Sequence, residues 1–178
     1  MNKVFLALLT LFMACVPMTS RQKEALWGNH PPIIKEILAT EVVRPGSGWK
    51  LYINAKDEDK DLACLYLFLY PLTGGPYFAK FIKIPSRFAQ NLKGYFILTV
   101  SDRWVWGTKI KVEIFLKDKA GHKSNPVYFL AKVVYKRPKI LRVPAELKHY
   151  LGMIDITFHT PFFDEGGYFK GIDWVWGN

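Results

Sequence analysis

The sequence has no apolar run long enough to cross a bilayer as a helix, which takes about 20 residues. Its longest apolar run, from Val4 to Ala14, is interrupted only by Thr10 and follows a single positive charge at Lys3. A short charged region and a short apolar core predict a signal peptide over residues 1–14, and no transmembrane helix is expected further along the chain.

The sequence also lacks the motifs of common enzymes. There is no HExxH zinc motif and no G-x-S-x-G elbow, and the GSG at 46–48 does not join a strand to a helix. The four histidines show no metal-ligand spacing, so we predict that the protein is not an enzyme. The remaining catalytic alternative is a hydrolase site near the carboxyl end, in which a histidine would have to meet a carboxylate. That site would use His149 or His159 with Asp155, Asp164 or Glu165.

The end of the apolar run, Ala14-Cys15, resembles the lipobox of bacterial lipoproteins, although Phe12 and Met13 depart from its usual residues. The resemblance implies that Cys15 is acylated and becomes the mature amino terminus, followed by a polar tether over 15–32. Because Val16 is not the aspartate that signals inner-membrane retention, it further implies the outer membrane of the cell envelope. Ordinary cleavage would instead give a soluble periplasmic or secreted protein.

The cysteine count and the net charge limit the disulfide bonds and the partners that the protein can have. With Cys15 lipidated, Cys64 has no partner for a disulfide, and we expect it to be a small buried hydrophobe. The net charge of +10 favours anionic neighbours such as acidic glycans or acidic proteins. Since the basic residues are spread along the chain without local clustering, no nucleic-acid partner is expected.

Beyond the tether, apolar and aromatic runs recur every ten to fifteen residues between turn-forming clusters, which predicts an all-β fold. In the sixth run, Ile110, Val112, Ile114 and Leu116 alternate with polar residues, so one face should be buried. The third run, 62–70, is apolar on both faces and needs a cover on its outer side. The predicted strands span 33–43, 49–56, 62–70, 77–84, 94–100, 109–117 and 127–135.

Seven strands with this turn spacing resemble an immunoglobulin-like or fibronectin-type-III-like antiparallel sandwich over 33–135. The most specific similarities are PPII at 31–34, DEDKDL at 57–62 and LKDKAGHKSNPVYF at 116–129, which looks like the last hairpin of bacterial Ig-like repeats. Residues 136–178 form an aromatic-rich extension with one or two further strands, of which 153–159 is one. We expect this extension to pack on the sandwich or on a partner.

Two motifs are candidate binding sites. The repeated WVWG places Trp104 with Trp106, and Trp174 with Trp176, on one face of an extended segment, where indoles could stack on sugars or simply pack in a core. The acidic turn DEDKD places Asp57, Asp59 and Asp61 at alternate positions. Carboxylates at this spacing could hold Ca²⁺, although a solvated turn is the simpler interpretation.

The sequence thus favours a non-catalytic envelope lipoprotein that acts as a protein-interaction or structural module. We expect strand edges and residues 153–178 to contribute the contact, with an envelope protein or an acidic glycan as partner. The alternative is a carbohydrate-binding module in which the four tryptophans form a stacking platform.

Overall fold

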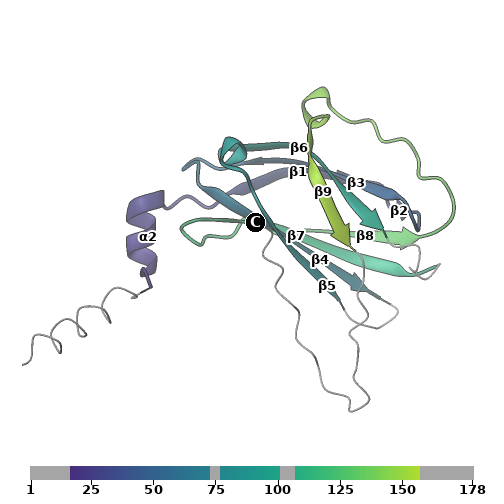
Figure 1. Ribbon diagram of the computed structural model, residues 1–178, viewed down its shortest axis with the longest axis horizontal. Helices are drawn as coiled ribbons and strands as arrows, with labels where there is room; N and C mark the ends of the chain where they lie inside the picture. Colours follow the sequence, from purple (N-terminus) through teal and green to yellow (C-terminus); the bar gives the residue numbers. More distant parts are fainter. Residues whose placement is uncertain (1–16, 73–76, 101–106, 157–178) are drawn as a thin grey trace, which may run out of the picture.

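The computed structural model describes residues 17–72, 77–100 and 107–156 (Figure 1). These residues form two β-sheets that pack face to face, which confirms the predicted all-β sandwich. The four-stranded sheet has the order β1 (Ile33–Ala39), β3 (Gly48–Lys56), β6 (Asn91–Val100), β9 (Tyr150–Ile156). The five-stranded sheet has the order β2 (Val42–Val43), β8 (Val127–Val133), β7 (Lys109–Asp118), β4 (Leu62–Pro71), β5 (Phe78–Lys83).

The described residues form nine strands where seven were predicted for the sandwich, because the first predicted strand divides and β9 joins a sheet. β1 pairs with β3 in one sheet, while β2 pairs with β8 in the other, so the chain changes sheets at Thr40 and Glu41. The Trp49 indole donates a hydrogen bond to the Thr40 carbonyl oxygen (3.1 Å) at this crossing. Apolar residues lie on both sides of the two polar residues at the crossing, and lysine and glutamate also occur inside the run, so hydrophobicity alone did not reveal the break.

The core follows the alternation predicted for the sixth run, and β3 and β6 show the same alternating burial as β7. On β7, Ile110, Val112, Ile114 and Leu116 are all fully buried, as expected for the inward face. The facing sheet contributes Trp49, Leu51, Ile53 and Ala55 of β3, which are also buried. Since each large apolar side chain stabilises the fold by about 1.5–3 kcal/mol when buried, a slip of one residue in the register would be strongly unfavourable.

The last described strand, β9, closes the four-stranded sheet by pairing in parallel with β6. Its approach requires Gly94, whose φ of +151° is a glycine conformation and whose added Cβ would meet the carbonyl oxygen of His149. The amide of Tyr95 donates to that same oxygen (2.8 Å). Residues 150–156 of the carboxyl-terminal extension are therefore part of the sandwich. Positions 157–159 of the predicted strand lie outside the described residues.

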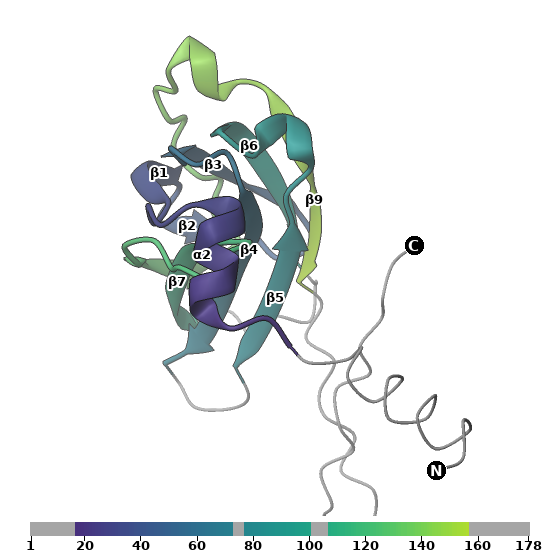
Figure 2. The same ribbon diagram turned by 90° about the vertical axis from the view of Figure 1, so that its left-hand side faces the viewer.

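A helix that the hydrophobic pattern does not predict, α2 (Ser20–Trp27), precedes the sandwich. Its amino-terminal turn is held by a capping box in which Thr19 and Gln22 bond each other's backbone amides. α2 buries none of its residues and lies beside one end of the sandwich (Figure 2). No helix among the described residues is both long and apolar enough to span a membrane.

Candidate metal centre and aromatic sheet face

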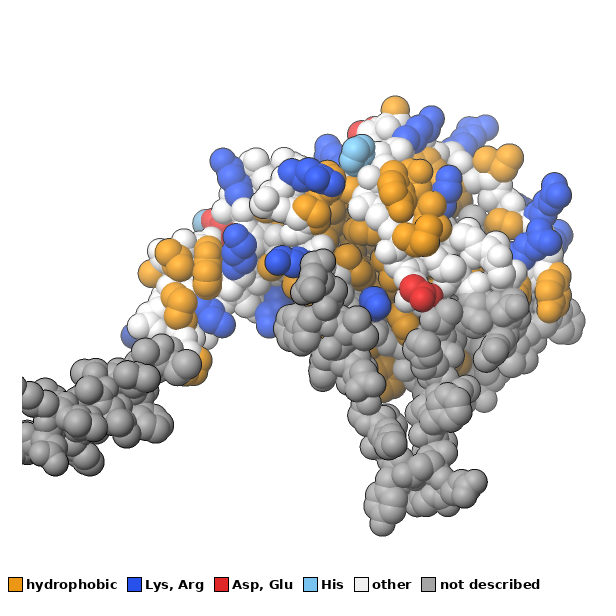
Figure 3. Space-filling model, viewed as in Figure 1, with side chains coloured by type: hydrophobic (Ala, Val, Ile, Leu, Met, Phe, Trp, Pro, Cys, Tyr) orange, Lys and Arg blue, Asp and Glu red, His pale blue; other side chains and the backbone are white. Residues whose placement is uncertain are grey.

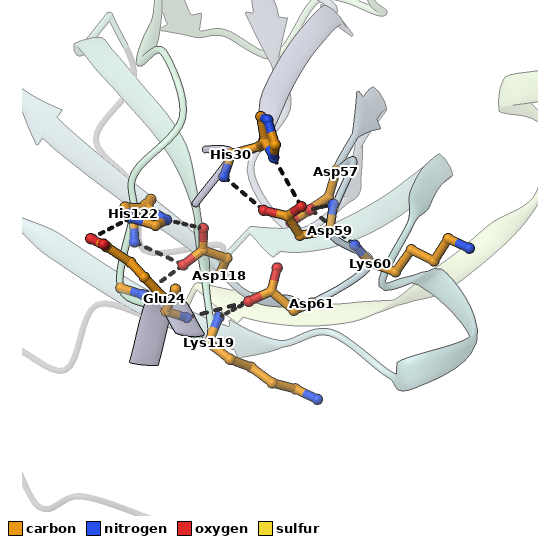
Figure 4. Close-up of polar contacts among 11 residues, drawn as sticks. Glu24, His30, Asp57, Asp59, Lys60, Asp61, Asp118, Lys119 and His122 are labelled. Atoms are coloured by element: carbon orange, nitrogen blue, oxygen red, sulfur yellow. Dashed lines mark hydrogen bonds and ion pairs between the residues drawn. The ribbon is translucent and has the colours of Figure 1, made fainter. Parts of the chain in front are cut away.

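Three buried aspartates meet beside the end of the sandwich that faces α2 (Figure 4). Asp57 follows the last residue of β3, Asp61 precedes the first residue of β4, and Asp118 is the last residue of β7. The side chains are almost inaccessible, since the residues are 0%, 4% and 4% exposed. One carboxylate oxygen of each lies within 4.8 Å of the others. We refer to these residues as the aspartate cluster.

The β3–β4 loop is wrapped around Asp57. One oxygen of this carboxylate, Oδ1, accepts hydrogen bonds from the amides of Asp59 (2.9 Å) and Lys60 (3.2 Å). The loop can turn this tightly because Lys60 adopts a left-handed conformation with φ of +63°. The side chain of Asp57 is thereby fixed with its second oxygen, Oδ2, directed away from these amides.

Asp61 joins the two loops of the cluster. Its Oδ2 accepts hydrogen bonds from the amides of Lys119 (3.1 Å) and Ala120 (3.3 Å) in the β7–β8 loop. Asp118 in turn orders that loop, since its Oδ1 accepts from the amides of Gly121 (2.6 Å) and His122 (2.8 Å). Backbone amides thus hold all three carboxylates in place.

Two carboxylate oxygens of the aspartate cluster accept no hydrogen bond from the described residues. Asp57 Oδ2 and Asp61 Oδ1 are buried and have no hydrogen-bond partner among the described residues. The side chains of Lys60 and Lys119 point away from the three carboxylates (Figure 4), and no cationic side chain in the described ranges makes an ion pair with Asp57 or Asp61. Loss of hydration on burial, reinforced by the charge of Asp61, raises the pKa of Asp57 to about 6. Burial, followed by the charge of Asp118, also raises the pKa of Asp61.

The cluster differs from the acidic triplet expected from spacing. Asp57 and Asp61 do come together, but Asp59 turns outward and binds His30 instead, through the His30 amide (2.7 Å) and Nδ1 (3.0 Å). That hydrogen bond from the His30 amide is the main reason why the pKa of Asp59 is lowered. Asp118 takes the third place in the cluster. It is far away in the sequence, and only the pairing of β4 with β7 brings it beside Asp61.

Two contacts connect the cluster to the chain that precedes the sandwich. His122 lies between Asp118 Oδ2 (Nδ1, 3.0 Å) and Glu24 of α2 (Nε2, 3.4 Å). Burial opposes protonation of His122, but the two carboxylates outweigh it and raise its pKa. Gly28, with φ of +101°, passes so close to Asp59 that a Cβ would overlap the carboxyl group. The segment from Glu24 to His30 is therefore packed onto the loops that hold the cluster.

A second feature is the outer face of the five-stranded sheet, which carries a row of aromatic rings. Tyr66 and Phe115 stack with ring centroids 4.7 Å apart, Phe68 stacks beside Phe115 at 5.9 Å, and Phe81 meets Tyr66 edge-on at 4.7 Å. We call these four residues, with Tyr70 next to Phe68, the aromatic face. They explain why the third predicted strand is apolar on both faces, because rings from β5 and β7 cover part of its outer side chains.

Lysines lie around the aromatic face, and Glu113 of β7 is an acidic residue at its side, opposite Phe68. Lys111 lies over the ring of Tyr128 (4.8 Å), and Lys123 lies over that of Phe115 (5.2 Å). The hydroxyls of Tyr70 and Tyr128 donate to Glu113 (3.2 and 3.4 Å). By strand alternation the same face presents Lys83, Lys109, Lys117 and Lys132. Basic side chains are also widespread on the side of the molecule seen in Figure 3, where acidic ones are few.

A third, shallower feature lies over the outer face of the four-stranded sheet. Here Tyr52 and Tyr95 pack at 5.4 Å, and Lys50 lies over the ring of Tyr95 (4.9 Å). Together with Arg142 and Lys148 they line an open hollow beneath the connection from β8 to β9. The hollow combines two aromatic rings with three basic side chains.

The remaining sequence candidates are not assembled into a site within the described part of the chain. His149 packs its ring against Phe88 (5.7 Å), and Asp155 lies on the edge strand β9. Cys64 is only half-buried, because it lies on the outer face of β4, and not in the core as predicted. Partial burial raises the pKa of its thiol, which favours the unreactive neutral form. The other candidates lie outside the described residues: Cys15, Trp104, Trp106, His159, Asp164, Glu165, Trp174 and Trp176.

No family model matches this chain, and no curated protein matches it. The description of this protein therefore rests on its structure. It is a β-sandwich with a buried aspartate cluster at one end and, on one sheet, an aromatic face with lysines around it.

Proposed function

We propose that this protein is a non-catalytic interaction module of the bacterial cell envelope that binds an acidic protein surface through its aromatic face. The observation behind the proposal is the packing of Tyr66, Phe68, Phe81 and Phe115 at partly exposed positions of one sheet. A contiguous apolar patch rimmed by charge is typical of a protein-binding surface.

The orientation of the rings favours a protein over a sugar as the partner. The stacking distance of 4.7 Å between Tyr66 and Phe115 equals the usual spacing of neighbouring strands, so the rings stand upright on the sheet. The flat faces of Tyr66 and Phe115 therefore cover one another and their edges point outward, while Phe81 meets Tyr66 edge-on. A sugar ring stacks on an exposed aromatic face, whereas a protein interface can bury edges and lysine stems together.

The fold supports the resemblance to immunoglobulin-like domains as part of this proposal. When the two-residue strand β2 and the edge strand β9 are set aside, seven strands remain, divided as β1-β3-β6 and β8-β7-β4-β5. All pairings among these seven are antiparallel, as in an Ig-like sandwich. Such sandwiches serve many binding functions, so the function rests on the aromatic face and not on the fold.

The membrane attachment proposed here comes from the Ala14-Cys15 sequence alone. A lipid on Cys15 would hold the sandwich close to the outer membrane and restrict its partners to components of the envelope. Replacing Cys15→Ser should release the protein into the soluble fraction when its host cells are broken, while the wild type sediments with membranes. Equal distribution of the two forms would contradict lipid anchoring.

A carbohydrate-binding role is the second candidate, and one observation favours it. The hollow lined by Tyr52, Tyr95, Lys50, Arg142 and Lys148 offers rings and positive charge together, which suits an acidic saccharide. This hollow lies on the four-stranded sheet, whereas the aromatic face lies on the five-stranded sheet, so variants can separate the two roles.

The experiment is crosslinking of the full-length protein in intact cells, with variants on each surface. We expect Phe81→Ser and Lys111→Glu to abolish one specific crosslinked protein, because they remove an exposed ring and reverse a charge on the aromatic face. Ile140→Ser and Lys93→Glu are the matched controls, since Ile140 is 99% exposed and Lys93 faces outward on β6 of the other sheet. The crosslink should persist in both controls.

Loss of the crosslink in the controls, or its persistence in both face variants, would refute the proposal. Binding of an acidic polysaccharide that is abolished by Lys50→Glu and unaffected by Phe81→Ser would establish the second candidate instead.

A further inference from the structure

We infer that Asp57, Asp61 and Asp118 form a binding site for a single calcium ion. The inference is independent of the aromatic face and of the partner proposed for it. It rests on the geometry of three buried carboxylates and on the two oxygens that the surrounding chain leaves without a partner.

The two unpartnered carboxylate oxygens indicate a bound cation. A buried carboxylate oxygen without a hydrogen bond is costly, and native structures contain few of them. Asp57 Oδ2 and Asp61 Oδ1 are two such atoms in one cluster, on residues that are 0% and 4% exposed. A cation among them would supply the missing partner of both oxygens at once.

Hydrogen bonds from backbone amides orient the three carboxylates as metal ligands would be oriented. Each carboxylate has one oxygen that accepts two backbone amides, namely Asp57 Oδ1, Asp61 Oδ2 and Asp118 Oδ1. The loops are therefore folded so that three like charges face one another, although like charges repel at this distance. Hydrogen bonds that fix the orientation of ligands in this way are typical of metal sites.

The donor set selects the kind of ion. All three ligands are carboxylates, which suit hard cations such as calcium and magnesium and not zinc or copper. The nearest imidazole, that of His122, is already engaged by Asp118 and Glu24. Since magnesium keeps several waters and usually uses one or two carboxylates, three buried carboxylates favour calcium. Oxygens around calcium at about 2.3–2.6 Å can be up to about 5 Å apart, a span that includes the 4.8 Å limit found here.

The position of the site gives the ion a mechanical role. The same two loops hold the preceding chain, through Asp59 with His30 and through His122 with Glu24. Calcium would fix both loops relative to each other and thereby the docking of the segment from Glu24 to His30. The ion would couple the sandwich to the chain that leads to its amino terminus.

Isothermal titration of the metal-stripped full-length protein with calcium chloride tests the inference, alongside thermal unfolding with calcium or with EDTA. We expect one calcium per chain and a rise in the unfolding temperature with calcium. Magnesium chloride should bind at least tenfold more weakly. Asp61→Asn and Asp118→Asn should abolish both responses. Asp59→Asn is the matched control from the same loop and should retain them, because Asp59 bonds His30 outside the cluster.

Absence of calcium binding by the wild type would overturn the inference, whether or not the variants fold. Equal binding by Asp61→Asn and by the wild type would also overturn it, because the ion would then lie elsewhere. Tighter binding of magnesium than of calcium would refute the choice of ion.

Discussion

We predict that the aspartate cluster makes the stability of the metal-free protein depend on pH, and the pKa of Asp57 gives the size of the effect. Its pKa is about 6 in the folded protein against 3.8 as the ordinary value. A folded-state pKa that is raised adds stability below the ordinary pKa, and this stability is lost as the pH rises through the folded pKa. Because a tenfold difference in proton affinity corresponds to about 1.4 kcal/mol, Asp57 should cost the folded state up to about 3 kcal/mol by pH 7.

The assay is urea unfolding in EDTA at several pH values between 4 and 7, for the wild type and for Asp57→Asn. Asp57→Asn removes the titration of Asp57 together with its charge interactions with Asp61 and Asp118, so the difference between the two proteins measures Asp57 within the cluster. We expect the free energy of unfolding of the wild type to fall relative to that of Asp57→Asn as the pH rises. Parallel pH profiles would refute the reasoning, because they would mean that Asp57 has the same pKa in the folded and unfolded chain.

Two further substitutions test the fold, one is a surface control, and a fourth tests the docking of the segment that precedes the sandwich. Leu67→Ala should lower the free energy of unfolding by about 2–5 kcal/mol in urea denaturation because Leu67 is fully buried. Leu130→Ala, the control at a position 56% exposed on the outer face, should change it by less than about 0.5 kcal/mol. Gly94→Ala should cost about 2 kcal/mol, measured in the same way, through its positive φ and the overlap with the carbonyl of His149. Gly28→Ala should detach the preceding segment from Asp59 and so speed limited proteolysis near Trp27, with little change in unfolding temperature.

The strands could be predicted from their apolar runs between turn-forming clusters, and β7 most accurately because it buries one side of an alternating sequence. The inward residues Ile110 to Leu116 on β7 follow the period of two, and the predicted bounds of this strand differ from the observed ones by one residue. The crossing at Thr40 could not be predicted, because it is set by which sheet each half pairs with and not by local hydrophobicity. The helix after Thr19 could have been found from its capping box, which is a sequence signal independent of periodicity.

The candidate sites were accessible to sequence reasoning only in part. The spacing of the acidic turn indicated Asp57, Asp59 and Asp61, of which Asp59 lies outside the cluster because it bonds His30. Asp118 could not be paired with them without knowing that β4 and β7 are neighbours. The aromatic face was indicated only as the uncovered outer side of the third run, because the rings that stack there come from three different strands.

The contacts of Glu24 and His30 determine how the protein would respond to a pull on its amino-terminal side. Tension travelling along the chain reaches α2 and His30 before it reaches Ile33, where the pairing of β1 with β3 begins. The contacts with His122 and Asp59 would therefore yield first and release the length of chain from Glu24 to His30. The β-sandwich would be shielded from small loads by a segment that can detach and rebind without unfolding any strand.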